Sequence, residues 1–491
     1  MTNGLFSLIK YGLHKCHYGF GGEPWKGGRC RNEGNYDSSW GKLDYAPEDP
    51  SDSQSVVDEL STLLTSGRLN TESRSIIKAQ YDSVQNKDQG LRLAQQLIAA
   101  SPEFHSTNLI ELTGIRRPIP EPVEPSTKPF KAVVFVNLKG ASDSYNFIVP
   151  HSQCSSKDMY AEYAQERGIV ALSKSSLHQI GTGGMSQVCN KFGIHPDLPA
   201  LKTLYDDNDL SFFTNVGVLF EYVNKDDWDV KTPTQLFAHN IQQRDIQTVD
   251  PNNEAFGTGV LGRMADVLTS KGYVTGSYST GDEQITLNGE PQKSPTVNTV
   301  SPNKMPVFNV NPSTENMHTV IADVNGLSTS TSGVFGKTWS NMLDESVRQN
   351  DRLREVLGEV DLNDQYPDSR LGQQLATVSS ILQMRDEFGQ DRQFFYVETG
   401  GWDTHLNQPQ EDQTLVPGLN AGLNAFVTLS KTQGIWDDIV VLVGSEFGRT
   451  FTPNSASGTD HGWGGKNSKF YFEYLFHIFL HMLRRRFFLY R

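Results

Sequence analysis

Three stretches near the end of the chain decide the fold: GGWDTH (Gly400–His405), DDIVVLVGSEFGRT (Asp437–Thr450) and GTDHGWGG (Gly458–Gly465). A short apolar run accompanies the first two, namely QFFYVET (Gln393–Thr399) and IVVLVG (Ile439–Gly444). Continuous apolar runs of this kind are typical of strands buried in a parallel sheet. Because ligands bind beyond the carboxyl ends of such strands, we expect the polar residues after each run to meet at one rim.

These polar residues are of types that bind divalent metals: Asp403, His405, Glu446, Asp460 and His461. Imidazole and carboxylate groups are ligands of zinc, whereas calcium or magnesium would be favoured if oxygen ligands dominate. Each stretch taken alone could equally be a turn or a helix cap. Their occurrence together favours a divalent metal site, with zinc as the preferred ion.

Composition limits the class of protein. The chain has 491 residues, enough for one large domain or two to three ordinary ones. A net charge of −14 argues against nucleic acid or an anionic membrane as a partner. None of the four cysteines lies in a CxxC pair, so no zinc ribbon or redox motif is indicated, and two disulfides are allowed but not required. Neither a signal peptide nor a membrane span is expected, and the compartment stays open.

Changes in composition predict five segments. Residues 1–52 lack periodicity and are expected to be irregular, and apolar residues at helical spacing predict a small helical module at 53–115. Residues 116–130 form a proline-rich linker. An α/β domain is expected at 131–465. The aromatic and basic tail at 466–491 does not resemble the end of such a domain; a faulty gene model or a truncation is favoured over a short interfacial helix.

The α/β prediction starts from KAVVFVNL (131–138), which suits the first buried strand and puts Asp143 in the loop after it. A helix is expected within 195–208 and a further strand at 210–218. This alternation predicts a doubly wound sheet. Thr234 falls at or near a helix amino terminus, where N–H groups and the helix dipole favour an anion.

Eight motifs across residues 131–465 resemble the domain-of-unknown-function 1501 family, a sulfatase-like branch of the alkaline-phosphatase superfamily. In order, they are FVNLKGASDSYNFIVP, HPDLPALKTLY, VGVL, PTQLFAHN, GVLGR, GGWDTHLNQ, SEFGRT and GTDHGWGG. The resemblance implies an alkaline-phosphatase-like, mostly parallel central sheet flanked by helices, with a site for one or two metals. Upstream, LRLAQQLIAASPEF resembles the tail of the helical domain-of-unknown-function 1800 family.

The resemblance also implies roles for residues. Thr234 matches the place of the nucleophile, although many family members seem to carry Ser-His where this chain has Thr234-Gln235. Arg449 is expected either to hold a phosphate or sulfate oxygen or to form a salt bridge or cap contact. His195 and His239 are interpreted as structural.

Two metal assignments stay open. In one, Asp460 and His461 act together as the Asp-His pair of the superfamily. In the other, which we prefer, Glu446 takes the carboxylate position. One metal then binds Asp403, His405 and His461, and the other binds Asp143, Glu446 and Thr234.

These residues predict a metal-dependent hydrolase of phosphate or sulfate esters, acting on a small molecule or a polysaccharide. The alternative is a non-catalytic member of the same fold that binds a ligand or partner through an incomplete metal site. A metal-free serine hydrolase is disfavoured because the chain lacks a G-x-S-x-G elbow.

Overall fold

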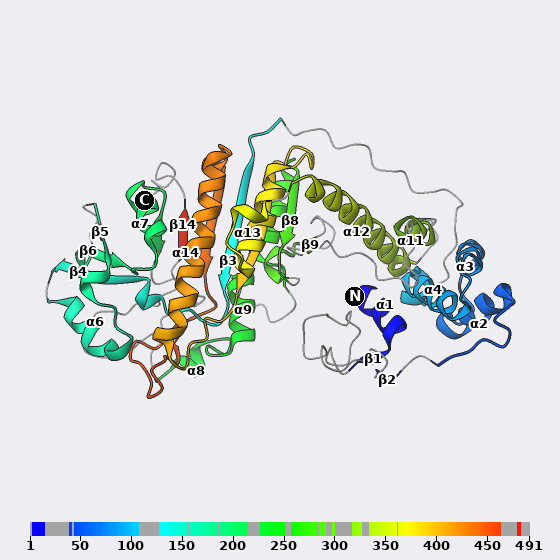
Figure 1. The fold of residues 1–491 in the computed structure, drawn as a ribbon, viewed down its shortest axis with the longest axis horizontal. Helices are drawn as coiled ribbons and strands as arrows, with labels where there is room; N and C mark the ends of the chain where they lie inside the picture. Colours follow the sequence, from blue (N-terminus) through cyan, green and yellow to red (C-terminus); the bar gives the residue numbers. More distant parts are fainter. Residues whose placement is uncertain are drawn as a thin grey trace. The chain divides into compact units, whose positions relative to one another are not determined.

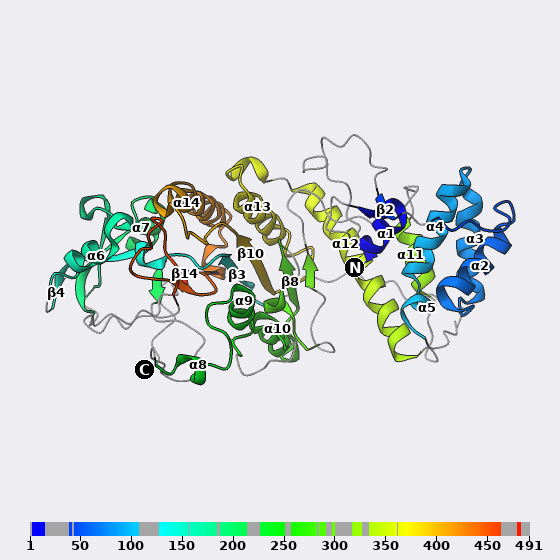
Figure 2. The same cartoon turned by 90° about the horizontal axis from the view of Figure 1, so that it is seen from below.

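The computed structural model describes residues 2–14, 39–41, 44–107, 127–155, 157–183, 187–213, 226–250, 257–281, 284–290, 297–299, 317–326, 333–360, 362–462 and 479–482. Contacts divide the chain into two compact units, drawn in Figures 1 and 2. The first unit joins Met1–Pro122 to Pro306–Leu353, and the second joins Val123–Met305 to Arg354–Arg491.

The first unit is helical. Its helices are α1 (Thr2–Tyr11), α2 (Ser53–Thr65), α3 (Thr71–Ser83), α4 (Lys87–Ala100), α5 (Pro102–His105), α11 (Met317–Gly326) and most of α12 (Val334–Glu359), and β1 (Leu13–His14) pairs with β2 (Ser39–Gly41). Side chains of Asp52, Asn70 and Asn86 accept hydrogen bonds from first-turn N–H groups, which fixes where α2, α3 and α4 begin. As Ser101-Pro102 predicts, α4 ends at Ala100.

Residues 306–353 belong to this helical unit, although the sequence predicts an α/β domain across 131–465. The reason is burial of an apolar stripe on α11 and α12. Its members lie in one core with residues of α2, α3 and α4: Met317, Ile321, Val324, Leu343 and Val347. Helical periodicity predicts that such a stripe is buried but not which helices cover it.

The second unit is built on a seven-stranded sheet in the order β7-β14-β11-β3-β10-β8-β9. Strands β11 (Ile439–Gly444), β3 (Lys131–Leu138), β10 (Arg392–Thr399), β8 (Thr275–Ser279) and β9 (Val297–Thr299) are parallel. At the other edge β14 (Phe479–Met482) is antiparallel to both β11 and β7 (Ser211–Phe213). The predicted α/β class with a mostly parallel sheet is therefore confirmed.

Helices cover both faces of this sheet, as Figure 2 shows. One face packs on α9 (His239–Thr248) and α10 (Val260–Ser270), and Phe135 and Phe394 belong to one apolar cluster with Leu261. The other carries α13 (Arg370–Gln383) and α14 (Gln408–Thr432). Further helices are α6 (Met159–Arg167), α7 (Pro199–Asp206) and α8 (Trp228–Lys231), with short 3-10 turns at Ser144–Asn146, Gly168–Val170, Lys174–Ser176, Ile285–Leu287, Asn363–Gln365 and Trp436–Asp438.

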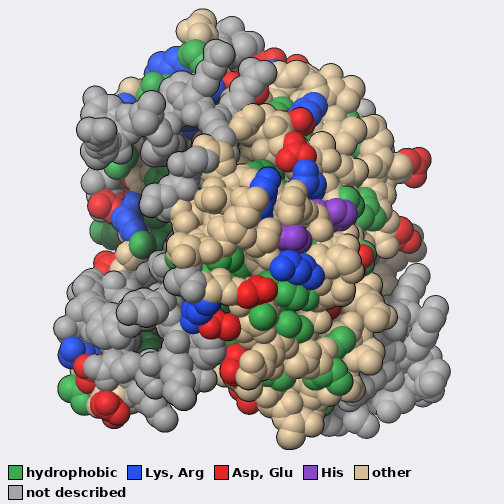
Figure 3. Space-filling view, turned by 90° about the vertical axis from the view of Figure 1, so that its left-hand side faces the viewer, with side chains coloured by type: hydrophobic (Ala, Val, Ile, Leu, Met, Phe, Trp, Pro, Cys, Tyr) green, Lys and Arg blue, Asp and Glu red, His purple; other side chains and the backbone are tan. Residues whose placement is uncertain are grey.

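A smaller antiparallel sheet flanks the central one, with the order β4-β6-β5. Its strands are β4 (Ile148–Cys154), β6 (Cys189–Ile194) and β5 (His178–Gly181), and a disulfide joins Cys154 to Cys189. Figure 3 shows the face on this side of the unit, where acidic and basic side chains are interspersed.

Some predicted segments lie wholly or partly outside the described residues. They include most of the linker at 116–130, the MPVFNV run at 305–310 and the carboxyl-terminal part of the 210–218 strand. Of the tail at 466–491, only β14 is described. None of the described helices combines the length and apolar character that crossing a membrane requires.

Candidate metal centre

The loops after β3 and β10 lie directly against each other because the two strands are neighbours in register. The Lys139 amide donates to the Thr399 carbonyl at 2.9 Å, and the Trp402 amide donates to the Lys139 carbonyl at 3.3 Å. Gly140 sits at their closest approach with φ +125°, and a Cβ there would lie 2.4 Å from the Asp403 nitrogen. Glycine is therefore required at this position for two reasons, its backbone conformation and the lack of space.

The loop after β11 supplies a buried carboxylate, Glu446, and a buried aromatic ring, Phe447, that packs against two histidines. Glu446 is fully buried. Its Oε1 accepts from the Gly140 amide at 2.8 Å and from the Gln243 side chain at 3.2 Å, and it lies 2.8 Å from Nδ1 of His239. The next residue, Phe447, is also fully buried and packs against the rings of His239 and His461, with centroids 4.8 and 4.9 Å apart.

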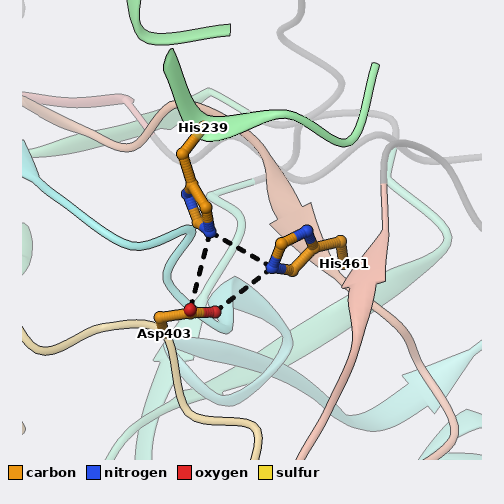
Figure 4. A group of neighbouring side chains, drawn as sticks. All are labelled: His239, Asp403 and His461. Carbon is orange, nitrogen blue, oxygen red and sulfur yellow. Dashed lines mark hydrogen bonds and ion pairs between the residues drawn. The ribbon is translucent and has the colours of Figure 1, made fainter. Parts of the chain in front are cut away.

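Three residues from three different elements converge in front of these loops, as Figure 4 shows: His239, Asp403 and His461. His239 is the first residue of α9, Asp403 follows β10, and His461 begins β13 (His461–Gly462), which pairs with β12 (Gly448–Arg449). The two Nε2 atoms are 3.1 Å apart, and Asp403 oxygens lie 3.6 Å from that of His239 and 3.3 Å from that of His461.

His405 adds a fourth donor to this group. Its Nε2 lies 2.9 Å from Nε2 of His461 and 3.0 Å from Oδ1 of Asp403. Ligands of a tetrahedral zinc ion, with bonds of about 2.1 Å, are separated by roughly 3.4 Å. The separations of 3.1 to 3.6 Å within the group of His239, Asp403 and His461 therefore suit one ion, and His405 lies 2.9 and 3.0 Å from two members of that group.

The opposite nitrogen of each imidazole contacts an oxygen acceptor. Nδ1 of His239 lies 2.8 Å from Glu446, that of His405 lies 3.1 Å from Asp460, and that of His461 lies 2.9 Å from the Phe237 carbonyl. Acceptors at Nδ1 favour a proton there, which leaves a lone pair on Nε2. Three lone pairs and a carboxylate facing one another repel unless a cation lies between them, so the donor set fits a metal.

Arg449 contacts Asp403, and all three nitrogens of its guanidinium donate hydrogen bonds to protein oxygens. Its Nη1 donates to Asp403 Oδ1 at 2.6 Å and to the Gly140 carbonyl at 3.2 Å, its Nε donates to Thr459 Oγ1 at 3.2 Å, and its Nη2 donates to the Thr459 carbonyl. This is the salt-bridge arrangement, one of the two alternatives that the sequence allows for Arg449. The contact orients Asp403 toward the histidines.

Electrostatics at the cluster follow from these contacts. The hydrogen bond to Glu446 raises the pKa of His239 above its ordinary value. Burial raises the pKa of Asp403, but the hydrogen bond and charge of Arg449 outweigh it and leave that pKa below its ordinary value. Burial likewise opposes ionisation of Glu446, and hydrogen bonds led by that of His239 keep its pKa low. The carboxylates are therefore held in the charged form that binds a cation.

Asp143 lies in a separate buried cluster. Its carboxylate pairs with the guanidinium of Arg167, a fully buried residue at the end of α6, and accepts from the Gln408 side chain and the Tyr145 amide. A buried carboxylate is stable only when it is paired and hydrogen-bonded, and Arg167 supplies the counter-charge here. The motif around Asp143 predicts its loop position, but no local signal points to Arg167.

Thr234 makes its hydrogen bonds with residues outside the cluster. Its hydroxyl donates to Asp245 at 2.5 Å and lies 3.4 Å from the Gln242 amide nitrogen. The helix expected near Thr234 begins at His239. The sequence alone suggests only a structural role for His239. The signal available for His239 was its place in PTQLFAHN, at the start of a predicted helix.

Asp412 on α14 gives a stability prediction. Burial, followed by the charge of Asp143, raises its pKa to about 7. Because the folded-state pKa exceeds the unfolded value of about 3.9, ionisation costs the native state stability as pH rises between these values. Asp412→Asn is therefore expected to raise the free energy of unfolding by about 1 to 3 kcal/mol at pH 8, measured by urea denaturation. The difference from the native protein should vanish near pH 4, and an equal effect at both pH values would contradict this origin.

Fold and cluster together define an α/β protein with a histidine and carboxylate centre at the carboxyl rim of a parallel sheet. The chain belongs to the family described as protein of unknown function (DUF1501), whose model matches residues 130–466. No curated protein matches the chain.

Proposed function

We propose that this protein is a metal-dependent hydrolase of phosphate or sulfate esters that binds one divalent ion through His239, His405, His461 and Asp403. The supporting observation is the convergence of three imidazole Nε2 atoms on one carboxylate, while each Nδ1 contacts an acceptor on its other side. Zinc is the favoured ion, because imidazole and carboxylate ligands at these separations suit it.

One ion, rather than the two that the resemblance allows, agrees with the partners of the remaining candidates. Asp143 is neutralised by Arg167, Glu446 contacts Nδ1 of His239, and Thr234 donates to Asp245. None of these three therefore needs a second cation to satisfy its charge or hydrogen bonds. The superfamily placement as an alkaline-phosphatase-like fold remains part of this proposal.

A bound divalent ion lowers the pKa of a water molecule and polarises an ester oxygen. The protein's own residues hold the site in shape: Glu446 and Asp460 orient two imidazoles, the Phe237 carbonyl orients the third, and Arg449 orients Asp403. Such contacts behind a ligand change metal affinity or activity by about 10- to 100-fold. The Thr234 hydroxyl is engaged by Asp245, so a solvent water is the nucleophile in this proposal.

His239→Gln provides the test, because the sequence alone did not single this residue out. We expect metal affinity to fall at least about 100-fold, measured by metal analysis after dialysis, with a parallel loss of p-nitrophenyl phosphate and sulfate hydrolysis. His151→Gln is the matched control: its ring contacts Ser152 and Gln179, remote in sequence from the cluster, and metal content should not change.

Two outcomes would contradict the proposal. A native protein that retains no divalent ion has no metal centre of this kind. A protein that binds one ion tightly but hydrolyses no phosphate or sulfate ester supports the alternative, a non-catalytic binding protein.

A further inference from the structure

We infer that the centre prefers an ester whose transferring group carries a single negative charge, a phosphodiester or a sulfate monoester, over the dianion of a phosphate monoester. This inference rests on the proposed function and specifies its substrate class. Two independent observations carry it: the charge balance of the cluster, and the exposed apolar residues on the segments that carry or contact its ligands.

The charge balance is set by four side chains. Asp403, Glu446 and Asp460 contribute three negative charges, and Arg449 is the cation that the described part of the chain brings into contact with them. With neutral imidazoles the sum is −3 + 1 = −2, so one divalent ion brings the centre to zero. A centre of zero net charge offers the substrate one metal ion, and the described residues bring no cation besides Arg449 into contact with these carboxylates to hold a second anionic oxygen.

Arg449 cannot supply that second contact. Its side chain is fully buried, and Nε, Nη1 and Nη2 all donate to protein oxygens. Swinging the guanidinium toward solvent would leave the Gly140 and Thr459 carbonyls without their donor. Arg449 therefore orients Asp403 and does not bind the substrate.

Two exposed apolar residues belong to the segments that carry or contact the metal ligands. Leu406 follows His405 and is 63% exposed, and Phe237, whose carbonyl contacts His461, is 37% exposed. The Phe237 ring packs edge-on against Trp228, with centroids 5.3 Å apart. Single exposed apolar residues are common, but these two lie on the backbone segments that carry or contact the metal ligands, where they would suit an organic substituent better than a second negative charge.

The test measures anion binding to the cobalt-loaded full chain, so that it does not depend on turnover. Diphenyl phosphate and phenyl sulfate are the singly charged probes, and phenyl phosphate at about pH 8 is the doubly charged one. Dissociation constants come from changes in the visible cobalt spectrum. We expect at least one singly charged probe to bind at least about tenfold more tightly than phenyl phosphate. Tighter binding of diphenyl phosphate than of phenyl sulfate would indicate a phosphodiester substrate, and the reverse order would indicate a sulfate ester.

A variant that changes the charge of the centre tests whether the preference arises from charge or from the shape of the probes. Asp460→Asn removes one negative charge but keeps an oxygen to accept from His405, so the preference for singly charged probes should shrink about tenfold. Asp207→Asn is the control, because its exposed carboxylate pairs with Lys431 and not with the cluster. It should leave the ratio unchanged.

The outcomes are distinguishable. Tighter binding of phenyl phosphate, or a ratio unaffected by Asp460→Asn, would overturn the inference while leaving a metal-dependent hydrolase possible. If the singly charged probes bind more tightly as expected but no ester is hydrolysed, the inferred charge preference is upheld and the proposed hydrolase activity is contradicted. Failure to bind cobalt at all would overturn both.

Discussion

Replacement of Gly140 by alanine is expected to weaken metal binding by at least about 100-fold. An added Cβ would lie 2.4 Å from the Asp403 nitrogen and 2.9 Å from the Trp402 carbonyl carbon, and these are backbone atoms that cannot turn away. The same residue donates its amide to Glu446, which contacts His239. One methyl group therefore disturbs a metal ligand and the residue that orients another. Isothermal titration with zinc measures the effect.

Gly434→Ala is the matched control for backbone strain. Gly434 also has a positive φ, +70°, but an added Cβ would meet no atom within 4 Å. It should cost roughly 1 to 2 kcal/mol of stability and leave zinc affinity unchanged. Equal loss of zinc in both variants would show that general destabilisation, not the contact with Asp403, is responsible.

Replacement of Arg167 by methionine is expected to lower the free energy of unfolding by about 3 to 5 kcal/mol, measured by urea denaturation. Arg167 and Asp143 are almost completely buried, and removing the guanidinium leaves the carboxylate without a counter-charge. The arginine also donates to the Phe451 carbonyl at 3.0 Å, which loses that partner. Methionine fills a similar apolar volume, so the missing charge dominates the loss.

The double variant Asp143→Asn/Arg167→Met removes both charges and should recover part of this stability. Asp143→Asn alone should leave metal content unchanged, because Asp143 contacts Arg167 and Gln408 and not the histidine cluster. Loss of zinc in that variant, with the fold intact, would restore Asp143 as a ligand and with it the two-metal assignment.

A continuous hydrogen-bond chain connects the two clusters. Asp403 contacts Arg449, Arg449 contacts Thr459, and Thr459 donates to Gln408 at 2.7 Å, which in turn donates to Asp143. Each of these residues except Asp403 is buried. These hydrogen bonds tie the Asp143 carboxylate to the loops that carry the metal ligands.

Much of the fold could be predicted from the sequence. The runs at 131–138, 393–399 and 439–444 became the three central parallel strands, because apolar continuity on both faces has few other stable outcomes. The loops after them follow directly, so Asp403, His405 and Glu446 were placed at the carboxyl rim. His461 was found because its GTDHG stretch stood out as a set with the others.

The sequence by itself determined the class of sheet, the rim at which polar groups gather and the types of group present, because strand periodicity and residue chemistry are local. Only the tertiary structure decided which of them meet. His239 joined Asp403 and His461 from more than 160 positions away in the sequence, whereas Asp143 turned to Arg167. Which side chains contact one another depends on how distant elements pack and on the need to neutralise each buried charge. Neither can be predicted from the sequence of a single segment.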